Sequence, residues 1–352
     1  MPDIEIKNLT KKFGDFTAVD KINLRIADKE YVTVLGPSGC GKTTMLRMIA
    51  GLLKPNSGDI LIDGKSVLET PPEDRNIGYL FQNYSLFPHM TVKQNVGYGP
   101  LMEGLSGGEA DMISIKMLKL VRLLERAGYM PATLSGGMQQ RVALMRSLAA
   151  GTRILFLDEP LSSLDPKVGV KLRYEIQKTA RKLDLTVIHV SHDQQDALSI
   201  SDRVVVMKQG RIVQAGSPKD IYFRPSTPYV SYFIGESNFL EVKQVGDGEV
   251  SFKGKTIKLA EPAKKGRLVV AIRPERILLE NKLENTFDGV VEKSNFLGST
   301  TKYLIKVGGY TFKVQTAKHP ELEKGDKTRL YLPPEDIMQF SGFNLEEELR
   351  IM

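Results

Sequence analysis

Residues 36–43 combine glycines with a lysine and a threonine at a spacing suited to binding phosphate. They read Gly36-Pro37-Ser38-Gly39-Cys40-Gly41-Lys42-Thr43, after an apolar run and before a helix-like run that opens at Thr44. This order predicts strand, loop, helix. The glycines let backbone N–H groups turn inward beside the positive end of the helix, so the loop would cradle nucleotide phosphates. Lys42 would reach the β- and γ-phosphates, and Thr43 would hold Mg²⁺.

Two adjacent carboxylates, Asp158 and Glu159, follow the apolar run 154–157. We expect their side chains to diverge where a buried strand leaves the core. Asp158 would support Mg²⁺ through its water shell, and Glu159 would polarise a water aimed at the γ-phosphate. Paired acids at a strand end also occur in ordinary turns. The phosphate loop earlier in the chain favours the catalytic interpretation.

Three further polar segments lie at the ends of predicted strands or at the start of a predicted helix, where a ligand could reach them. Gln82 and His192 each come after a strand-like run, and ligands bind at the C-terminal edge of a parallel sheet. A histidine in this position can equally be structural. A second glycine-bearing turn, Ser135-Gly136-Gly137, opens another helix and supplies another anion-binding end.

Bulk properties restrict the classes of protein. A chain of 352 residues with 41% hydrophobic residues predicts two or three folded domains. Without a membrane-spanning run or a secretory signal, we expect it to be soluble and intracellular. The single cysteine excludes a disulfide framework and a cysteine-rich metal site. The net charge of +7 is spread among acidic residues and lacks interleaved aromatics, so we do not expect nucleic-acid binding.

The predicted elements divide the chain at about residue 235. Residues 1–235 alternate β-rich and helical stretches, which predicts an α/β domain with a largely parallel sheet. Residues 112–126 have helical spacing, with an apolar stripe that we interpret as core. Short apolar runs predict buried strands at 32–35, 154–157, 187–190 and 204–207.

Residues 236–352 change to short strands and glycine turns, which predicts an all-β domain. Within it, Arg273-Pro274-Glu275-Arg276-Ile277 is echoed by Pro333-Pro334-Glu335-Asp336-Ile337, each after a β-like run. A duplicated small barrel would explain the echo. Two independent Pro-Glu turns would explain it equally well.

The motifs of residues 3–235, in their order along the chain, resemble the ATP-binding cassette ATPases, a group of P-loop NTPases. They are the phosphate loop, Gln82, Leu134-Ser135-Gly136-Gly137, Asp158-Glu159, Ser162-Ser163-Leu164-Asp165 and His192. The resemblance implies a helical subdomain at about 85–150 and a head-to-tail homodimer that binds ATP and Mg²⁺. Ser135 and Gly137 of one subunit would close over the ATP held by Lys42 and Thr43 of the other.

The same resemblance implies roles for single residues. Phe13 would stack on adenine, and Gln82 would link Mg²⁺ to the transporter. His192 would contact the γ-phosphate, and Asp165 would communicate across the dimer. Met138 stands where these proteins commonly have Gln, so we do not expect a polar contact from that side chain.

Two sites in the cassette allow more than one interpretation. Residues 105–109 repeat the Leu-Ser-Gly-Gly pattern but stand too soon after Gln82 and lack the Gln-Gln-Arg continuation, so we expect no catalytic role. Cys40 either fills the loop or is a thiol made reactive by the helix N-terminus and Lys42. On the second interpretation, alkylation of Cys40 would block ATP binding.

Residues 236–352 resemble the transport-associated OB-type (TOBE) domain of importer ATPases for sugars, polyamines and oxyanions. The apolar segment 84–92 either packs locally or is similar to the surface that receives a coupling helix from membrane subunits. We therefore predict the ATPase subunit of a binding-protein-dependent ABC importer, peripheral on the cytoplasmic face of the membrane. Its partners would be integral-membrane permease subunits and, indirectly, an extracytoplasmic solute-binding protein.

Two alternatives come from other classes. A soluble cassette protein acting on nucleic acid or the ribosome would typically carry two cassettes or a long coiled-coil insertion, and the sequence has neither. A C-terminal barrel that binds nucleic acid would give oligonucleotide binding with a steep salt dependence.

Within the importer interpretation, the segment Phe87-Pro88-His89 is closer to the corresponding segment of oxyanion or polyamine importers than to that of sugar importers. The solute itself would be selected by other subunits.

Overall fold

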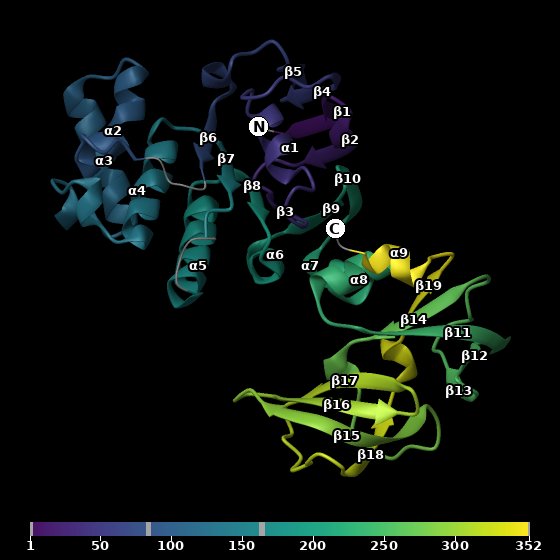
Figure 1. The fold of residues 1–352 in the computed structure, drawn as a ribbon. Helices are drawn as coiled ribbons and strands as arrows, with labels where there is room; N and C mark the ends of the chain where they lie inside the picture. Colours follow the sequence, from purple (N-terminus) through teal and green to yellow (C-terminus); the bar gives the residue numbers. More distant parts are fainter. Residues whose placement is uncertain (1–2, 82–85, 162–165, 351–352) are drawn as a thin grey trace. The chain divides into compact units, whose positions relative to one another are not determined.

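The computed structural model describes residues 3–81, 86–161 and 166–350. Contacts divide the chain into two compact units, Met1–Lys219 and Asp220–Met352 (Figure 1). Within the described parts, no helix is long and apolar enough to cross a bilayer. Gln82 and Ser162–Asp165, which the sequence assigned to the site, lie outside the described residues.

A six-stranded sheet forms the centre of the first unit, in the order β10-β9-β3-β8-β7-β6. Five strands, β9 to β6 in this order, run parallel to one another, and β10 pairs antiparallel with β9 at one edge. The strands are β3 (Tyr31–Leu35), β6 (Ile77–Leu80), β7 (Ile154–Asp158), β8 (Thr186–Ser191), β9 (Arg203–Lys208) and β10 (Arg211–Gly216). The four predicted buried strands and the largely parallel sheet are confirmed. Short, mostly apolar runs form such strands because helices or sheets cover both faces, and the polar exceptions, Thr33 and His189, are buried with the rest.

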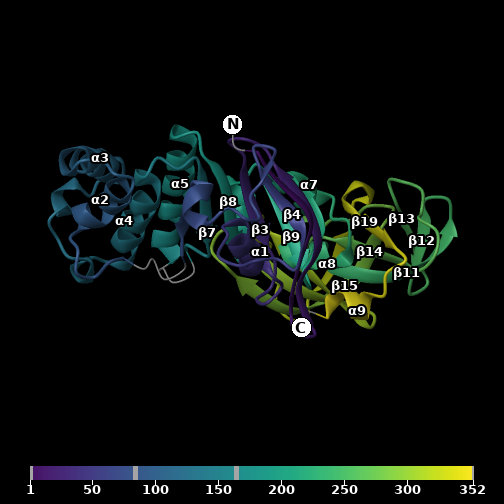
Figure 2. The same cartoon turned by 90° about the horizontal axis from the view of Figure 1, so that it is seen from above.

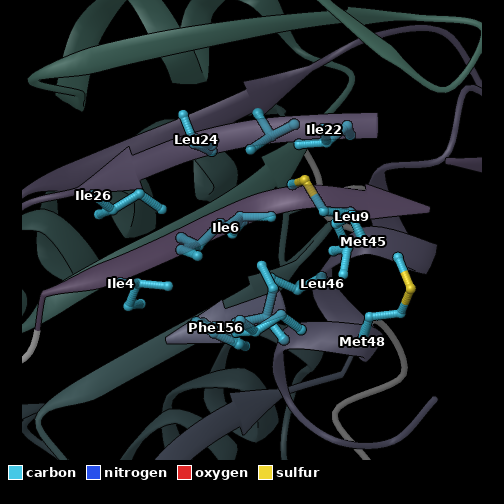
Figure 3. Close-up of a cluster of buried hydrophobic side chains, with 14 of the residues drawn as sticks. Ile4, Ile6, Leu9, Ile22, Leu24, Ile26, Met45, Leu46, Met48 and Phe156 are labelled. Carbon is cyan, nitrogen blue, oxygen red and sulfur yellow. The ribbon is translucent and has the colours of Figure 1, made fainter. Parts of the chain in front are cut away.

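Alternate residues of these strands face two separate cores. Phe156 of β7 belongs to one cluster with α1 (Lys42–Ile49), whereas Leu155 and Leu157 belong to the other with α4 (Gly136–Ala149). Figure 3 shows Met45, Leu46 and Met48 of α1 among the residues of the first cluster. An antiparallel sheet in the order β2-β1-β4-β5 completes that core: β1 (Ile4–Phe13), β2 (Phe16–Ile26), β4 (Ser57–Ile62) and β5 (Lys65–Ser66).

Helices α2 (Val92–Met102), α3 (Gly107–Leu120) and α4 are grouped together in both views (Figures 1 and 2), and Figure 1 shows them beyond the β6 edge of the sheet. They lie inside the range predicted for a helical subdomain. The remaining helices of this unit are α5 (Pro166–Lys182) and α6 (Gln194–Ile200), with short 3₁₀ turns at Pro72–Arg75, Leu124–Arg126 and Pro131–Thr133.

The helix predicted at 112–126 has different ends in the structure. Helix α3 begins at Gly107, where Ser106 and Glu109 form a capping box in which each side chain bonds the other's backbone N–H. It ends before Arg122, whose φ of 55° lies in the left-handed region. The predicted apolar stripe nevertheless packs in the core with α4, as interpreted.

The second unit is built from two antiparallel sheets with matching topology. One has the order β13-β12-β11-β14-β19 and the other β17-β16-β15-β18. In both, the first four strands along the chain are arranged third, second, first, fourth, and a 3₁₀ Pro-Glu turn follows the fourth strand. This shared order favours duplication over two independent turns. The strands are β11 (Asn238–Gly246), β12 (Glu249–Phe252), β13 (Lys255–Lys258), β14 (Leu268–Ile272), β15 (Thr286–Phe296), β16 (Thr301–Val307), β17 (Tyr310–Thr316), β18 (Lys327–Tyr331) and β19 (Met338–Ser341).

Arg273 explains why the second unit begins before the predicted boundary at 235. Its buried guanidinium follows β14 and donates to the carbonyls of Ser231 (2.6 Å), Gly235 (2.8 Å) and Tyr222 (3.0 Å). These contacts join α8 (Pro228–Ile234) and the end of α7 (Pro218–Phe223) to the β domain. A short helix, α9 (Leu345–Leu349), also packs on α8.

Candidate nucleotide site

The phosphate loop leaves β3 at Leu35 and requires glycine at two crowded positions. At Gly36, an added Cβ would lie 2.6 Å from the carbonyl oxygen of Met207. At Gly41, φ is 104° and an added Cβ would lie 2.2 Å from the Ala18 carbonyl oxygen. The glycine spacing in the sequence therefore reflects close backbone approach as well as turn geometry.

Lys42 begins α1 and is buried, with its ammonium turned back over the loop. The Nζ atom donates to the carbonyls of Gly36 (2.8 Å) and Pro37 (3.0 Å). Gly41 precedes the helix without a side-chain cap, so no side chain among the described residues caps the first turn of α1. An ammonium beside backbone N–H groups at a helix start is an arrangement that binds phosphate.

Thr43 and Asp158, the two predicted Mg²⁺ residues that the structure describes, are brought together. The Thr43 hydroxyl donates to Asp158 Oδ1 at 2.8 Å, and Tyr79 donates to Oδ2 at 3.1 Å. Hydroxyl and carboxylate oxygens are the ligands that Mg²⁺ prefers, so the donor set fits the ion. No group of three or more His, Cys, Asp or Glu side chains suited to a metal occurs in the described residues.

Tyr79 was missed by the sequence analysis. Burial and the neighbouring charge of Asp158 raise the pKa of Tyr79, so its hydroxyl stays protonated and remains a donor. Tyr79 lies in the strand-like run that precedes Gln82, so the residue itself was visible in the sequence. Its contact with Asp158 depends on β6 pairing with β7, which a single sequence does not specify.

Glu159 and His192, which follow the neighbouring parallel strands β7 and β8, also meet. Glu159 Oε2 lies 3.2 Å from His192 Nδ1, and the Glu159 N–H donates to the Val190 carbonyl at 2.9 Å. Glu159 has a φ of 47°, a left-handed conformation that is uncommon for residues other than glycine. Such backbone conformations concentrate at functional sites, and here the turn aims the carboxylate at the imidazole.

The two Leu-Ser-Gly-Gly segments differ in how their serines are used. The Ser106 hydroxyl accepts from the Glu109 N–H in the capping box of α3. Ser135 precedes α4 with similar backbone angles, but in the described structure its side chain makes no cap hydrogen bond and is exposed. The exposed hydroxyl of Ser135 is therefore available to a ligand, whereas that of Ser106 is committed to the fold.

Helix α4 also contacts the segment that follows β7, through a residue the sequence analysis missed. The buried Gln140 side chain donates to the Pro160 carbonyl at 2.6 Å, directly after Glu159. Met138, which stands where the resembling proteins commonly have Gln, packs against the apolar core.

Phe13 lies at the end of the β1–β2 hairpin, opposite Phe16. Half of its surface is exposed, and Lys11 Nζ lies 5.2 Å from the ring centroid. An exposed ring beside a cation is suited to stacking on an aromatic base, which is the role the resemblance implies.

Cys40 fits the first of its two interpretations, that of a packing residue. Burial raises the pKa of the Cys40 thiol, and the nearby Lys42 ammonium offsets only part of that shift. A raised pKa means that less thiolate exists near neutral pH, and the thiolate is the reactive form. The interpretation of Cys40 as a reactive thiol is therefore not favoured.

We expect iodoacetamide to label Cys40 much more slowly in the folded protein than in the urea-unfolded chain. Labelling should accelerate only as the pH rises above the usual thiol range of about 8.5, because the folded-state pKa is raised. Mass spectrometry at a series of pH values measures both rates. Equal rates in the two states would restore the reactive-thiol interpretation.

Comparisons with known proteins agree with this geometry. The ABC transporter family model matches residues 19–162, and the TOBE domain model matches residues 270–340. The chain is 42% identical over 327 residues to the spermidine/putrescine import ATP-binding protein PotA of Thermotoga maritima, with 89% of each chain covered. It is 42% identical over 308 residues to the Fe(3+) ions import ATP-binding protein FbpC of Brucella abortus, covering 86% of this chain and 87% of the relative.

A solved structure supports the same assignment for the first unit. It is a dimeric ATP-binding cassette, MJ0796, in a post-hydrolysis state with ADP and Pi bound. It matches with a TM-score of 0.55 and 34% identity, covering 61% of this chain and 98% of that one. The fold, the phosphate loop and these likenesses agree, and the chain belongs to the ABC transporter family as an ATP-binding, ATP-hydrolysing cassette with a C-terminal TOBE domain.

Proposed function

We propose that the chain drives solute import as a homodimer whose two ATP sites are each shared between subunits. The observation that carries the proposal is the separation of the two phosphate-binding ends within one chain. Lys42 opens α1 on one face of the central sheet, and Ser135 opens α4, which packs in the core of the other face. An exposed serine and two glycines at the start of α4 suit the phosphates of an ATP held by another subunit.

Within each shared site, this chain's residues would divide the work of hydrolysis. The loop N–H groups and Lys42 hold the phosphates, and Thr43 and Asp158 hold Mg²⁺, which neutralises charge on the phosphates when bound. Glu159 takes a proton from the water whose oxygen attacks the γ-phosphorus, and ADP leaves. His192, 3.2 Å from Glu159, orients that carboxylate and contacts the γ-phosphate. Gln82 and Asp165 keep the sensing and cross-dimer roles implied by the resemblance.

The closing motion would pass to integral-membrane permease subunits, with the chain peripheral on the cytoplasmic face and a solute-binding protein acting outside. The relatives named as import ATP-binding proteins support this reading. In the segment predicted for coupling, Phe87 packs 4.6 Å from the ring of Tyr98, while Pro88 and His89 are exposed. The segment would thus anchor through Phe87 and present its next two residues to a partner.

The solute class most in keeping with the relatives is a cation such as a polyamine or Fe(3+), since those are the solutes their names state. The test is uptake of labelled spermidine, putrescine, Fe(3+), sugars and oxyanions by the source cells with and without Lys42→Ala. We expect the substitution to abolish uptake of one class, because the ammonium over the phosphate loop is lost. An import function would be contradicted if the Lys42→Ala cells took up every solute as fast as the wild-type cells, while the purified wild-type protein hydrolysed ATP.

A further inference from the structure

We propose that Arg173 is a positioning residue that fixes the turn carrying His192. The inference rests on the catalytic role proposed for His192 and identifies what holds that residue in place. Arg173 lies on α5, whereas His192 follows β8, so the sequence gives no sign of their relation.

The guanidinium of Arg173 spans two carboxylates on the C-terminal side of His192. Its Nε atom donates to Asp196 Oδ1 at 2.5 Å, and its NH2 group donates to Asp193 Oδ2 at 3.1 Å. The side chains of Arg173 and Asp196 are only 7% and 2% exposed. A rigid planar fork can hold two acceptors at a fixed separation, which a lysine ammonium cannot do.

The residue before His192 joins the same network. The Ser191 hydroxyl donates to Asp196 Oδ2 at 2.7 Å and accepts from the Asp193 N–H at 2.9 Å. Asp193 in turn caps α6 by accepting from the Gln195 N–H at 2.7 Å. Both neighbours of His192 are therefore bound to the buried pair of Arg173 and Asp196.

The imidazole needs this support because its own surroundings are open. The His192 side chain is 55% exposed, and a cavity of about 230 Å³ lies beside it, lined also by Glu159, Arg173 and Val170. A ring with room to swing depends on its backbone for direction. A buried ion pair adds little net stability compared with apolar packing, so geometric control is the stronger reason for its presence here.

A double-mutant cycle on ATP turnover tests the inference with Arg173→Met, His192→Ala and the combined variant. We expect Arg173→Met to lower kcat roughly tenfold to a hundredfold, the size associated with small misplacement of a catalytic group, with KM for ATP unchanged. Because Arg173 acts through His192, the combined variant should turn over at the same rate as His192→Ala. Arg173→Lys keeps the positive charge but loses the planar guanidinium, so its kcat should lie between those of Arg173→Met and the wild type.

Arg181→Met is the matched control, since Arg181 lies on the same helix and pairs with a different carboxylate, that of Asp202, at 2.5 Å. The side chains of this pair are 45% and 42% exposed, unlike the buried pair of Arg173 and Asp196. It should leave kcat unchanged. If circular dichroism shows that Arg173→Met does not fold, Ser191→Ala carries the same cycle, because it removes two hydrogen bonds of the turn without unpairing a buried charge.

The outcomes separate the two claims. If His192→Ala lowers kcat but the effects of the two substitutions multiply, Arg173 acts independently of His192 and the inference is overturned while the proposed function stands. If His192→Ala leaves turnover unchanged, the role proposed for His192 is wrong and the inference falls with it.

Discussion

Glu159→Gln is expected to abolish steady-state ATP hydrolysis while ATP still binds. The amide has the size of the carboxylate and can occupy the same turn beside His192, but it cannot accept a proton from water. Loss of a general base lowers kcat by about 10²–10⁴-fold. Phosphate release measures turnover, and a fluorescent ATP analogue measures binding.

The same substitution should stabilise the dimer, because ATP closes the shared sites and is not consumed. Size-exclusion chromatography with light scattering should then detect an ATP-dependent dimer. Glu175→Gln is the matched control: Glu175 lies on α5, 3.9 Å from Arg141, and should retain turnover. Wild-type turnover by Glu159→Gln would remove Glu159 from the role of base.

Ser135→Arg is expected to stop turnover, whereas Ser106→Arg is not. A long charged side chain at the exposed start of α4 would keep the partner's ATP from docking, so we expect kcat to fall at least about 100-fold, the loss typical of removing a transition-state donor. Stability should hardly change, since in the described structure the Ser135 side chain makes no cap hydrogen bond.

Ser106→Arg reverses this pattern. It breaks the capping box of α3, which should lower the free energy of unfolding by about 1 kcal/mol in urea titrations. Its turnover should stay at the wild-type level. If both serine variants lose turnover equally, or if Ser135→Arg retains it, the start of α4 does not form part of the ATP site.

The parts of the fold that could be predicted from the sequence are those determined by local composition. Four short, mostly apolar runs formed strands because strands covered on both faces bury nearly all of their side chains. The position of His192 at the C-terminal edge of a parallel sheet could also be predicted, whereas its contact with Glu159 could not, because that depends on β7 pairing with β8. The helix at 112–126 was placed wrongly because the capping box at Ser106 and Glu109 was overlooked as a start signal.

Other features depend on tertiary contacts that no local pattern contains. Tyr79 reaches Asp158 only because β6 pairs with β7, and Arg173 reaches Asp193 and Asp196 only because α5 packs against α6. The second unit begins at Asp220 and not near residue 236 for a similar reason. Arg273 binds the backbone carbonyls of Ser231 and Gly235, about 40 residues earlier in the chain, and so joins that segment to the β domain. The echoed Pro-Glu turns were explained equally well by duplication and by two independent turns, and the shared strand order is what favours duplication.

Turnover per subunit as a function of wild-type concentration tests the shared-site account most directly. Phosphate release and sedimentation velocity would be measured on the same dilution series at saturating ATP. Because each ATP needs Lys42 from one chain and Ser135 from another, turnover per subunit should fall on dilution in step with the dimer fraction. Constant turnover at concentrations where sedimentation detects monomer alone would contradict the account.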